Sequence, residues 1–256
     1  LDSGAYVFVE KPLSHDWEGV DDLLQAELAH GIKKIAIGYQ FRFHPAMKLV
    51  KLMLEQGRIG HLVSARQVNG EYMPGWHPYE DYRNSYAARR DLGGGALVTQ
   101  IHDFDFSQWL FGRPQQVFAV GGQLSSLEVD VEDSVQVLMQ CENEGRALPV
   151  SISLDYLQWP PSRSLSIIGE IGRIDCDLIS SKVCLSDLNC RETEFHDFPE
   201  LDRNDIFLEE LQKFLCFAAG DTEPWVDLEE GIASLRMALA ARESMETGKS
   251  VPIVWS

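Results

Sequence analysis

The sequence predicts an α/β segment built on a parallel sheet, followed by an α+β domain with a large, mostly antiparallel sheet. Two observations support this order. Residues 6–39 alternate strand, helix and strand, which is the repeating unit of a parallel sheet. Residues 116–196 instead contain consecutive short strand patterns with no helix between them, as expected when neighbouring strands run antiparallel.

Proline and glycine residues divide the first part of the chain into short elements. The expected elements are a strand over 6–10, a helix that Ser14 caps and Gly31 ends, a strand over 33–39, a helix from Pro45 to Gly57, and a strand over 62–72. Both helices have apolar residues at intervals of three and four, so each has one face to bury.

A long loop over 73–95 separates the two parts, and it is rich in aromatic, arginine, proline and glycine residues. Long loops in compact domains are either functional or disordered, and the aromatic content argues against disorder. The elements expected after it are a helix over 96–111, strands over 116–124, 134–141, 148–157, 164–168, 172–177 and onward to 196, and helices over 205–219 and 228–247.

Charge and composition favour a small-molecule partner. The 256 residues carry a formal net charge of -18, which disfavours binding to nucleic acid or to an anionic membrane surface. No apolar run approaches the roughly 18 residues of a membrane span. The five cysteines show no C-x-x-C spacing, so we expect free thiols, no metal site and a reducing, cytoplasmic location.

Lys11 is the first candidate for chemistry. It follows the first strand in the tripeptide Glu10-Lys11-Pro12. The carboxyl ends of parallel strands form the edge at which open α/β sheets bind ligands. A lysine after a strand is also often simply solvated, and this tripeptide alone does not decide between the two interpretations.

The second candidate is the segment that follows Gly93-Gly94-Gly95. The glycines permit close approach of the backbone to a ligand, and Thr99, His102 and Asp105 recur at intervals of three along one face of the expected helix. Such a polar stripe in an apolar helix suggests function. The alternative is a histidine that only hydrogen-bonds its neighbours and steadies the packing.

These motifs together resemble the oxidoreductases grouped with glucose-fructose oxidoreductase, inositol dehydrogenase and MocA. The resemblance covers essentially the whole chain and rests on VFVEKPLS at 7–14, GYQFRFHP at 38–45 with GRIG at 57–60, and GGG at 93–95 with HDFD at 102–105. It implies that residues 1–40 are the end of a Rossmann-type dinucleotide-binding domain. Residues 41–256 would then form the substrate-binding, catalytic and oligomerisation domain.

The resemblance implies hydride transfer between a sugar carbon and NAD or NADP. Lys11 would polarise the substrate oxygen and orient the nicotinamide, and His102 would accept and donate the proton. The family usually has an aspartate one helical turn before this histidine; here Thr99 stands at that position and cannot act as a base. We place the remaining cofactor contacts at Glu10, Pro12 and Gln40.

The expected substrate is a sugar or a nucleotide sugar, because WHPYEDYR at 76–83 and LDYLQWPP at 154–161 resemble a subgroup that handles such compounds. Aromatic faces stack on sugars, and arginine forks bind phosphate. The candidate substrate-binding residues are Arg42, Trp76, Tyr82, Arg83, Arg89, Asp105, Tyr156 and Trp159. About half of such a set is expected to serve packing only.

The sequence contains no G-x-G-x-x-G motif to hold the diphosphate of a dinucleotide. In the family this motif lies before the Glu-Lys-Pro strand, so we expect the cofactor site to be incomplete in this chain. Two hypotheses follow: the catalytic part of an oxidoreductase, or a non-catalytic sugar-binding or oligomerisation module derived from one. The resemblance also implies a homodimer or homotetramer.

Overall fold

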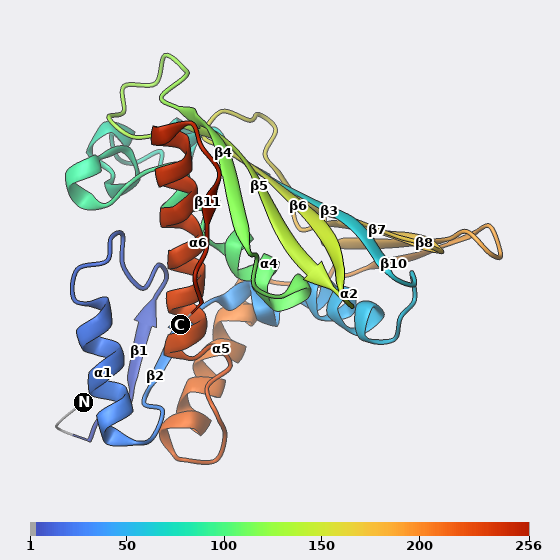
Figure 1. Ribbon diagram of the computed structural model, residues 1–256, viewed down its shortest axis with the longest axis horizontal. Coiled ribbons are helices and arrows are strands. Elements are labelled where there is room, and N and C mark those ends of the chain that lie inside the picture. The colour runs from blue at the N-terminus through green and yellow to red at the C-terminus, as the bar shows by residue number, and fades with distance from the viewer. Residues whose placement is uncertain (1–3, 256) are drawn as a thin grey trace.

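The computed structural model describes residues 4–255 and arranges their strands in two sheets (Figure 1). The smaller sheet pairs β1 (Val7–Glu10) with β2 (Ile35–Gly38) in parallel, and α1 (Val20–His30) connects them. This confirms the expected strand, helix and strand. The helix begins five residues later than predicted, because the Ser14 hydroxyl accepts a hydrogen bond within a turn that ends at Gly19.

The second sheet has nine strands in the order β10-β9-β8-β7-β3-β6-β5-β4-β11. Its members are β3 (Leu62–Gly70), β4 (Gln116–Gly122), β5 (Ser134–Asn143), β6 (Arg146–Asp155), β7 (Ser162–Gly169), β8 (Gly172–Asp177), β9 (Lys182–Asp187), β10 (Glu192–Asp197) and β11 (Val251–Pro252). Only β3 and β6 pair in parallel, which confirms the prediction of a mostly antiparallel sheet.

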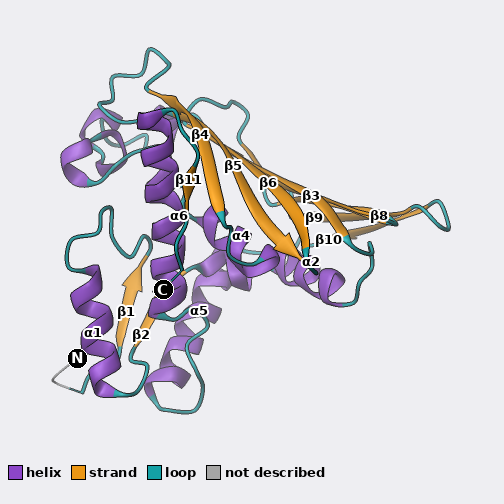
Figure 2. Ribbon diagram, viewed as in Figure 1, coloured by secondary structure: helices purple, strands orange, loops and turns teal. Residues whose placement is uncertain are grey.

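The helices gather on one face of the large sheet (Figure 2). They are α2 (Pro45–Glu55), α3 (Ala96–Thr99), α4 (His102–Phe111), α5 (Arg203–Ala218) and α6 (Leu228–Thr247). Helix α6 packs along β4 and against α4, and it also contacts β2, so it joins the two sheets. No helix within residues 4–255 is both long and apolar enough to cross a membrane.

Short 3-10 turns replace the irregular loop expected over 73–95. They are η2 (Met73–Gly75), η3 (Tyr82–Asn84), η4 (Tyr86–Ala88) and η5 (Arg90–Leu92), and a similar turn, η1 (Gln40–Phe43), follows β2. Backbone hydrogen bonds connect this loop to its surroundings. For example, the amide of Gly95 donates to the carbonyl of Ala87, and the amide of Ala96 donates to the carbonyl of Glu132.

The single helix predicted over 96–111 is wrong. The chain breaks into α3 and α4 at Gln100 and Ile101, and Gln100 has φ -97° and ψ 31°. Its side chain donates to the carbonyl of Asp155 on β6, a contact with another element that the local sequence pattern does not reveal. The break frees the carbonyl of Thr99 from the helical hydrogen-bond pattern.

Phe104 on α4 is fully buried in the core between the helices and the large sheet, and its truncation tests that core. We expect Phe104→Ala to lower the free energy of unfolding by about 3–5 kcal/mol, through lost burial and the cavity left behind. Leu52→Ala on α2 is the control, since that side chain is 47% exposed. Equal losses in chemical denaturation of the two variants would contradict this assignment of the core.

Candidate active site

Lys11 lies directly after β1, where the small sheet meets the helices of the large one. Its ammonium donates a hydrogen bond of 2.9 Å to the carbonyl oxygen of Thr99, the last residue of α3. Burial lowers the pKa of Lys11 from 10.5 to about 8, and the positive charge of Arg163 adds to this effect, whereas Glu10 opposes it. Lys11 is therefore a cation whose proton is exchangeable near neutral pH.

His102 begins α4 and is only 2% exposed. Its ring lies 4.9 Å from the ring of Phe41 and 5.6 Å from that of Tyr39, measured between centroids. This apolar enclosure lowers the pKa of His102 well below 6.5, and the charges of Lys11 and Arg163 lower it further. The imidazole is therefore neutral at physiological pH. Its buried Nδ1 has no hydrogen-bond partner among the described residues.

Thr99 contributes its backbone to the site. The carbonyl that receives Lys11 is present in every residue type, so an aspartate is not required there to hold the lysine in place. The Thr99 hydroxyl lies beside the phenol groups of Tyr86 and Tyr156 and affects the pKa of both. The three residues of the predicted stripe therefore have different neighbours. Thr99 lies beside two tyrosines, His102 packs against Phe41, and Asp105 pairs with Arg42.

Asp103 extends the site toward the large sheet. Its carboxylate is buried and accepts a hydrogen bond of 2.8 Å from the side-chain amide of Asn69 on β3. Burial raises the pKa of Asp103 to about 6, although the positive charge of Arg163 and the Asn69 bond act in the opposite direction. This carboxylate is therefore charged at pH 7 but close to its titration range.

Arg163 on β7 is a residue that the sequence analysis missed. It is the direct cross-strand neighbour of Asn69, and its guanidinium carbon lies 4.6 Å from the centre of the Phe41 ring. Phe41 thus contacts both Arg163 and His102. The available signal was an arginine on the inward-facing side of this strand, where the next residues, Leu165 and Ile167, are apolar and buried.

Arg42 and Asp105, both predicted to bind substrate, instead bind each other. The guanidinium of Arg42 donates to both carboxylate oxygens of Asp105, at 2.7 and 3.1 Å, and also donates to Glu230 at 2.8 Å. Asp105 is fully buried and Arg42 is 7% exposed. A substrate would have to break this ion pair to contact either residue, so we assign them to the core.

The remaining candidates for substrate binding lie on the loop over 73–95 and after β6. Arg83 and Arg89 are exposed, and each pairs with a carboxylate two residues away in sequence, Asp81 and Asp91 respectively. Trp159 is 83% exposed. These three side chains are not brought to Lys11 by any contact among the described residues.

Three aromatic side chains complete that set: Trp76 and Tyr82 pack within the loop region, whereas Tyr156 also reaches the site. Trp76 packs edge-on against the buried ring of Tyr156, with centroids 5.1 Å apart, and the Tyr156 hydroxyl donates to the carbonyl of Ala87. Tyr82 accepts a hydrogen bond from the amide of Glu128. Of the three, only Tyr156 approaches the site, through Thr99.

A nicotinamide cofactor fits the described residues at one end only. Glu10, Lys11 and Pro12 occupy the carboxyl edge of the parallel strands, and the buried Gln40 has a side-chain oxygen without a hydrogen-bond partner among the described residues. Ligands of open α/β sheets bind at this edge, so these groups are positioned to contact a cofactor bound there. None of the described segments is a glycine-rich turn that leads from a strand of the small sheet into a helix, as a diphosphate requires.

The run of glycines at 93–95 does not provide that turn. A Cβ atom on Gly94 would lie 2.4 Å from the carbonyl oxygen of Tyr86, and one on Gly95 would lie 2.3 Å from the side chain of Glu132. Protein atoms therefore already occupy the space that these glycines leave. Their role is close packing of the loop against the end of the large sheet.

Comparison with known proteins agrees with this fold. Residues 51–253 match the Gfo/Idh/MocA oxidoreductase family, C-terminal alpha/beta domain. The chain belongs to this oxidoreductase family. It is also 29% identical over 255 residues to myo-inositol 2-dehydrogenase of Thermotoga maritima, a match that covers 97% of this chain and 72% of that protein.

Solved structures show the same fold at lower sequence identity. The WlbA dehydrogenase from Bordetella pertussis, in complex with NADH and UDP-GlcNAcA, is 22% identical with a TM-score of 0.79, over 100% of this chain and 74% of that one. Levoglucosan dehydrogenase, in complex with NADH and levoglucosan, is 20% identical with a TM-score of 0.83, over 98% and 74%.

The pairing of Arg42 with Asp105 can be tested by measuring stability. We expect Asp105→Asn to lower the free energy of unfolding by about 1–3 kcal/mol, because it removes the fully buried one of the two carboxylates that pair with Arg42, while Glu230 remains. Glu229→Gln is the control, since Glu229 forms an exposed ion pair with Arg113 and should change stability by no more than about 1 kcal/mol. A stable Asp105→Asn protein that has lost only ligand binding would show instead that Asp105 serves the substrate.

Proposed function

We propose that this chain is the catalytic part of a nicotinamide-dependent dehydrogenase that interconverts a hydroxyl carbon and a carbonyl carbon of a sugar or nucleotide sugar. The observation that carries the proposal is the association of Lys11, a cation with a pKa of about 8, with the neutral, buried imidazole of His102. The family membership and the relative named as an inositol dehydrogenase support it.

Oxidation of a secondary alcohol removes a proton from its oxygen and a hydride from its carbon. The nicotinamide, when bound, supplies the hydride acceptor. The Lys11 ammonium would donate a hydrogen bond to the substrate oxygen and stabilise the negative charge that develops there. The unpartnered Nδ1 of His102 would accept the hydroxyl proton.

The charges around His102 favour release of that proton after it is accepted. Lys11 and Arg163 both oppose a positive charge on the imidazole, so an imidazolium formed during the reaction readily gives its proton back. Because His102 is 2% exposed, a substrate oxygen can reach it only if neighbouring groups such as Lys11 shift. Substrate entry and catalysis are therefore expected to involve movement at the Lys11–Thr99 contact.

Titration of the purified protein with NAD(H) and NADP(H), followed by nicotinamide fluorescence or by calorimetry, tests the cofactor requirement. The proposal expects binding that Lys11→Ala weakens at least tenfold, whereas Lys182→Ala on β9 leaves it unchanged. Absence of binding would contradict a catalytic role for this polypeptide. It would favour a non-catalytic sugar-binding or oligomerisation module derived from the family.

The pH dependence of turnover tests the role of Lys11. Its pKa is lowered to about 8, so the ammonium that polarises the substrate oxygen is present below pH 8 and is lost as the pH rises through that value. We therefore expect kcat/KM to fall on the alkaline side with a midpoint near pH 8. His102 stays neutral well below pH 6.5, so it should impose no loss between about pH 6 and 7.

Lys11→Arg is the matched variant for this experiment, because a guanidinium remains charged at every pH used. Its kcat/KM should be at least tenfold lower, since the planar fork does not reproduce the ammonium geometry, and its alkaline decline should disappear. An alkaline decline in Lys11→Arg identical to that of the unmodified protein would show that a different group titrates.

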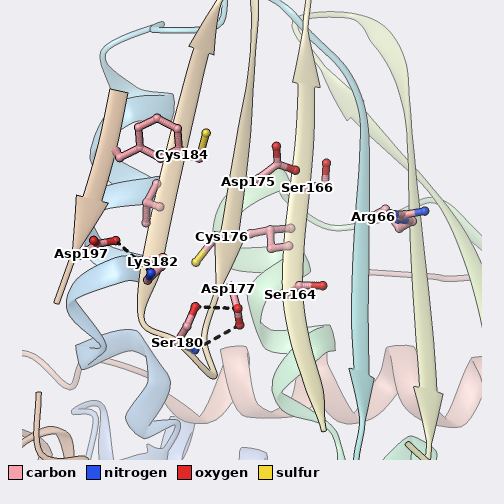
Figure 3. A pocket seen from close by; sticks show the side chains of 13 residues that line it. Arg66, Ser164, Ser166, Asp175, Cys176, Asp177, Ser180, Lys182, Cys184 and Asp197 are labelled. Carbon is pink, nitrogen blue, oxygen red and sulfur yellow. Dashed lines mark hydrogen bonds and ion pairs between the residues drawn. The ribbon is translucent and has the colours of Figure 1, made fainter. Parts of the chain in front are cut away.

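We also propose that a second copy of the chain covers the open face of the large sheet. One cross-strand row on this face is formed by Phe118, Leu138, Ser151, Arg66, Ser166, Asp175, Cys184 and Phe195. Figure 3 shows part of this row around a hollow, with Ser166, Asp175 and Cys184 on adjacent strands. The apolar side chains Phe118, Leu138 and Phe195 are 39%, 51% and 74% exposed, respectively.

Light scattering coupled to size-exclusion chromatography tests this assembly. We expect the mass of a homodimer or homotetramer, and we expect Leu138→Arg to reduce it toward that of the 28.9 kDa monomer. Leu52→Arg on α2 is the control, because Leu52 is 47% exposed but belongs to a helix on the other face. A monomer at all concentrations would contradict the proposed interface.

A further inference from the structure

We propose that Arg163 binds an anionic group of the substrate, so that the sugar carries a carboxylate or a phosphate close to the carbon that reacts. The inference rests on the proposed function for the position of the reacting carbon. It adds a substrate class and a specificity-determining residue that lies outside the pair formed by Lys11 and His102.

Among the arginines of residues 4–255 that are not exposed, Arg163 is the one whose guanidinium makes no hydrogen bond or ion pair. Arg42, Arg83 and Arg89 are all paired with aspartates of the chain at 2.6–2.7 Å. No residue in the range 4–255 makes a hydrogen bond or ion pair to the Arg163 side chain, whose guanidinium lies over the face of the Phe41 ring. The donors of this fork are therefore available to a ligand.

The position of Arg163 is fixed relative to His102. Asn69 lies opposite Arg163 on β3, and the same Asn69 side chain holds Asp103, the residue that follows His102. Phe41 contacts the Arg163 guanidinium at 4.6 Å and the His102 ring at 4.9 Å. Arg163 and His102 thus share contact with Phe41, and the charge of Arg163 is close enough to lower the pKa of His102.

The local charge also favours an anion. Lys11, like Arg163, is only partly exposed and forms no ion pair with a carboxylate in the described part of the chain; its partner is a backbone carbonyl. Cations removed from water without counter-charges are costly, and a bound anion would compensate both of them. This cluster lies in a chain of net charge -18, where carboxylates for pairing are abundant elsewhere.

The nearby carboxylates do not supply that compensation. Burial lowers the pKa of Arg163, whereas the negative charges of Asp103 and Glu71 raise it, but neither carboxylate forms an ion pair with its guanidinium. The Asp103 carboxylate accepts its hydrogen bond from Asn69 instead. An arginine fork binds carboxylate and phosphate through two parallel hydrogen bonds, so both groups match the vacant donors chemically.

Binding of a matched ligand series by isothermal titration tests the inference without requiring turnover. The probes are D-glucuronate, its neutral amide D-glucuronamide, D-glucose 6-phosphate and D-glucose. We expect at least one of the two anions to bind tenfold or more tightly than its neutral counterpart. Preference for glucuronate would identify a sugar acid, and preference for the phosphate would identify a sugar phosphate.

Arg163→Gln should remove this preference, and Arg163→Lys should retain only part of it because it keeps the charge without the fork. Arg173→Gln, on the neighbouring strand but on the exposed face, is the control and should bind as the unmodified protein does. Thermal melts of all three variants establish that they are folded.

Equal affinity for charged and neutral probes, or no binding of any probe, would overturn the inference and leave the nicotinamide titration to decide the proposed function separately. An anion preference that survives in Arg163→Gln would also overturn it, because another residue would then be responsible. An anion preference lost in Arg163→Gln, in a protein that fails to bind nicotinamide, would support the inference and contradict the dehydrogenase.

Discussion

The hydrogen bond between the Lys11 ammonium and the Thr99 carbonyl is the contact on which the site depends. It joins the end of a parallel strand to the end of a short helix 88 residues further along the chain. The carbonyl is available only because α3 stops at Thr99, and the next helix starts at His102. A continuous helix would have used that oxygen internally.

Desolvation then sets the chemical character of each group. Removing water from Lys11 lowers its pKa to about 8, and enclosing His102 among aromatic rings keeps the imidazole neutral. The same loss of water raises the pKa of Asp103 to about 6. One apolar environment, supplied largely by η1 and α4, thus moves the titration of a lysine and an aspartate toward neutral pH, where proton transfer in catalysis is most effective.

Much of the fold follows from the sequence because its signals are local. The strand, helix and strand at the start of the chain, the antiparallel strands and the closing helices are each encoded by periodicity and by glycine or proline boundaries. The break at Gln100 is not, since it depends on a hydrogen bond to Asp155 in a strand that lies 55 residues away. Long-range contacts of this kind override a helical pattern.

The candidate site was predictable to the extent that it lies in short motifs. Lys11 and His102 come from two such motifs, and the fold brings them to one place, where Lys11 bonds to the Thr99 carbonyl and its charge lowers the pKa of His102. Residue type alone could not reveal that Arg42 and Asp105 satisfy each other in the core. Nor could it select Arg163 from among the arginines, because what distinguishes Arg163 in the described structure is partial burial without any hydrogen bond or ion pair to its guanidinium.

Direct titration of the Lys11 side chain tests the central claim of this account, namely that the ammonium is held in a desolvated, cationic environment. Nuclear magnetic resonance of 13C-methylated lysines, with the Lys11 signal assigned through Lys11→Arg, would give its pKa without any dependence on substrate or cofactor. We predict a midpoint near pH 8. A midpoint near 10.5, the ordinary value for lysine, would show that Lys11 is solvated and would contradict the account.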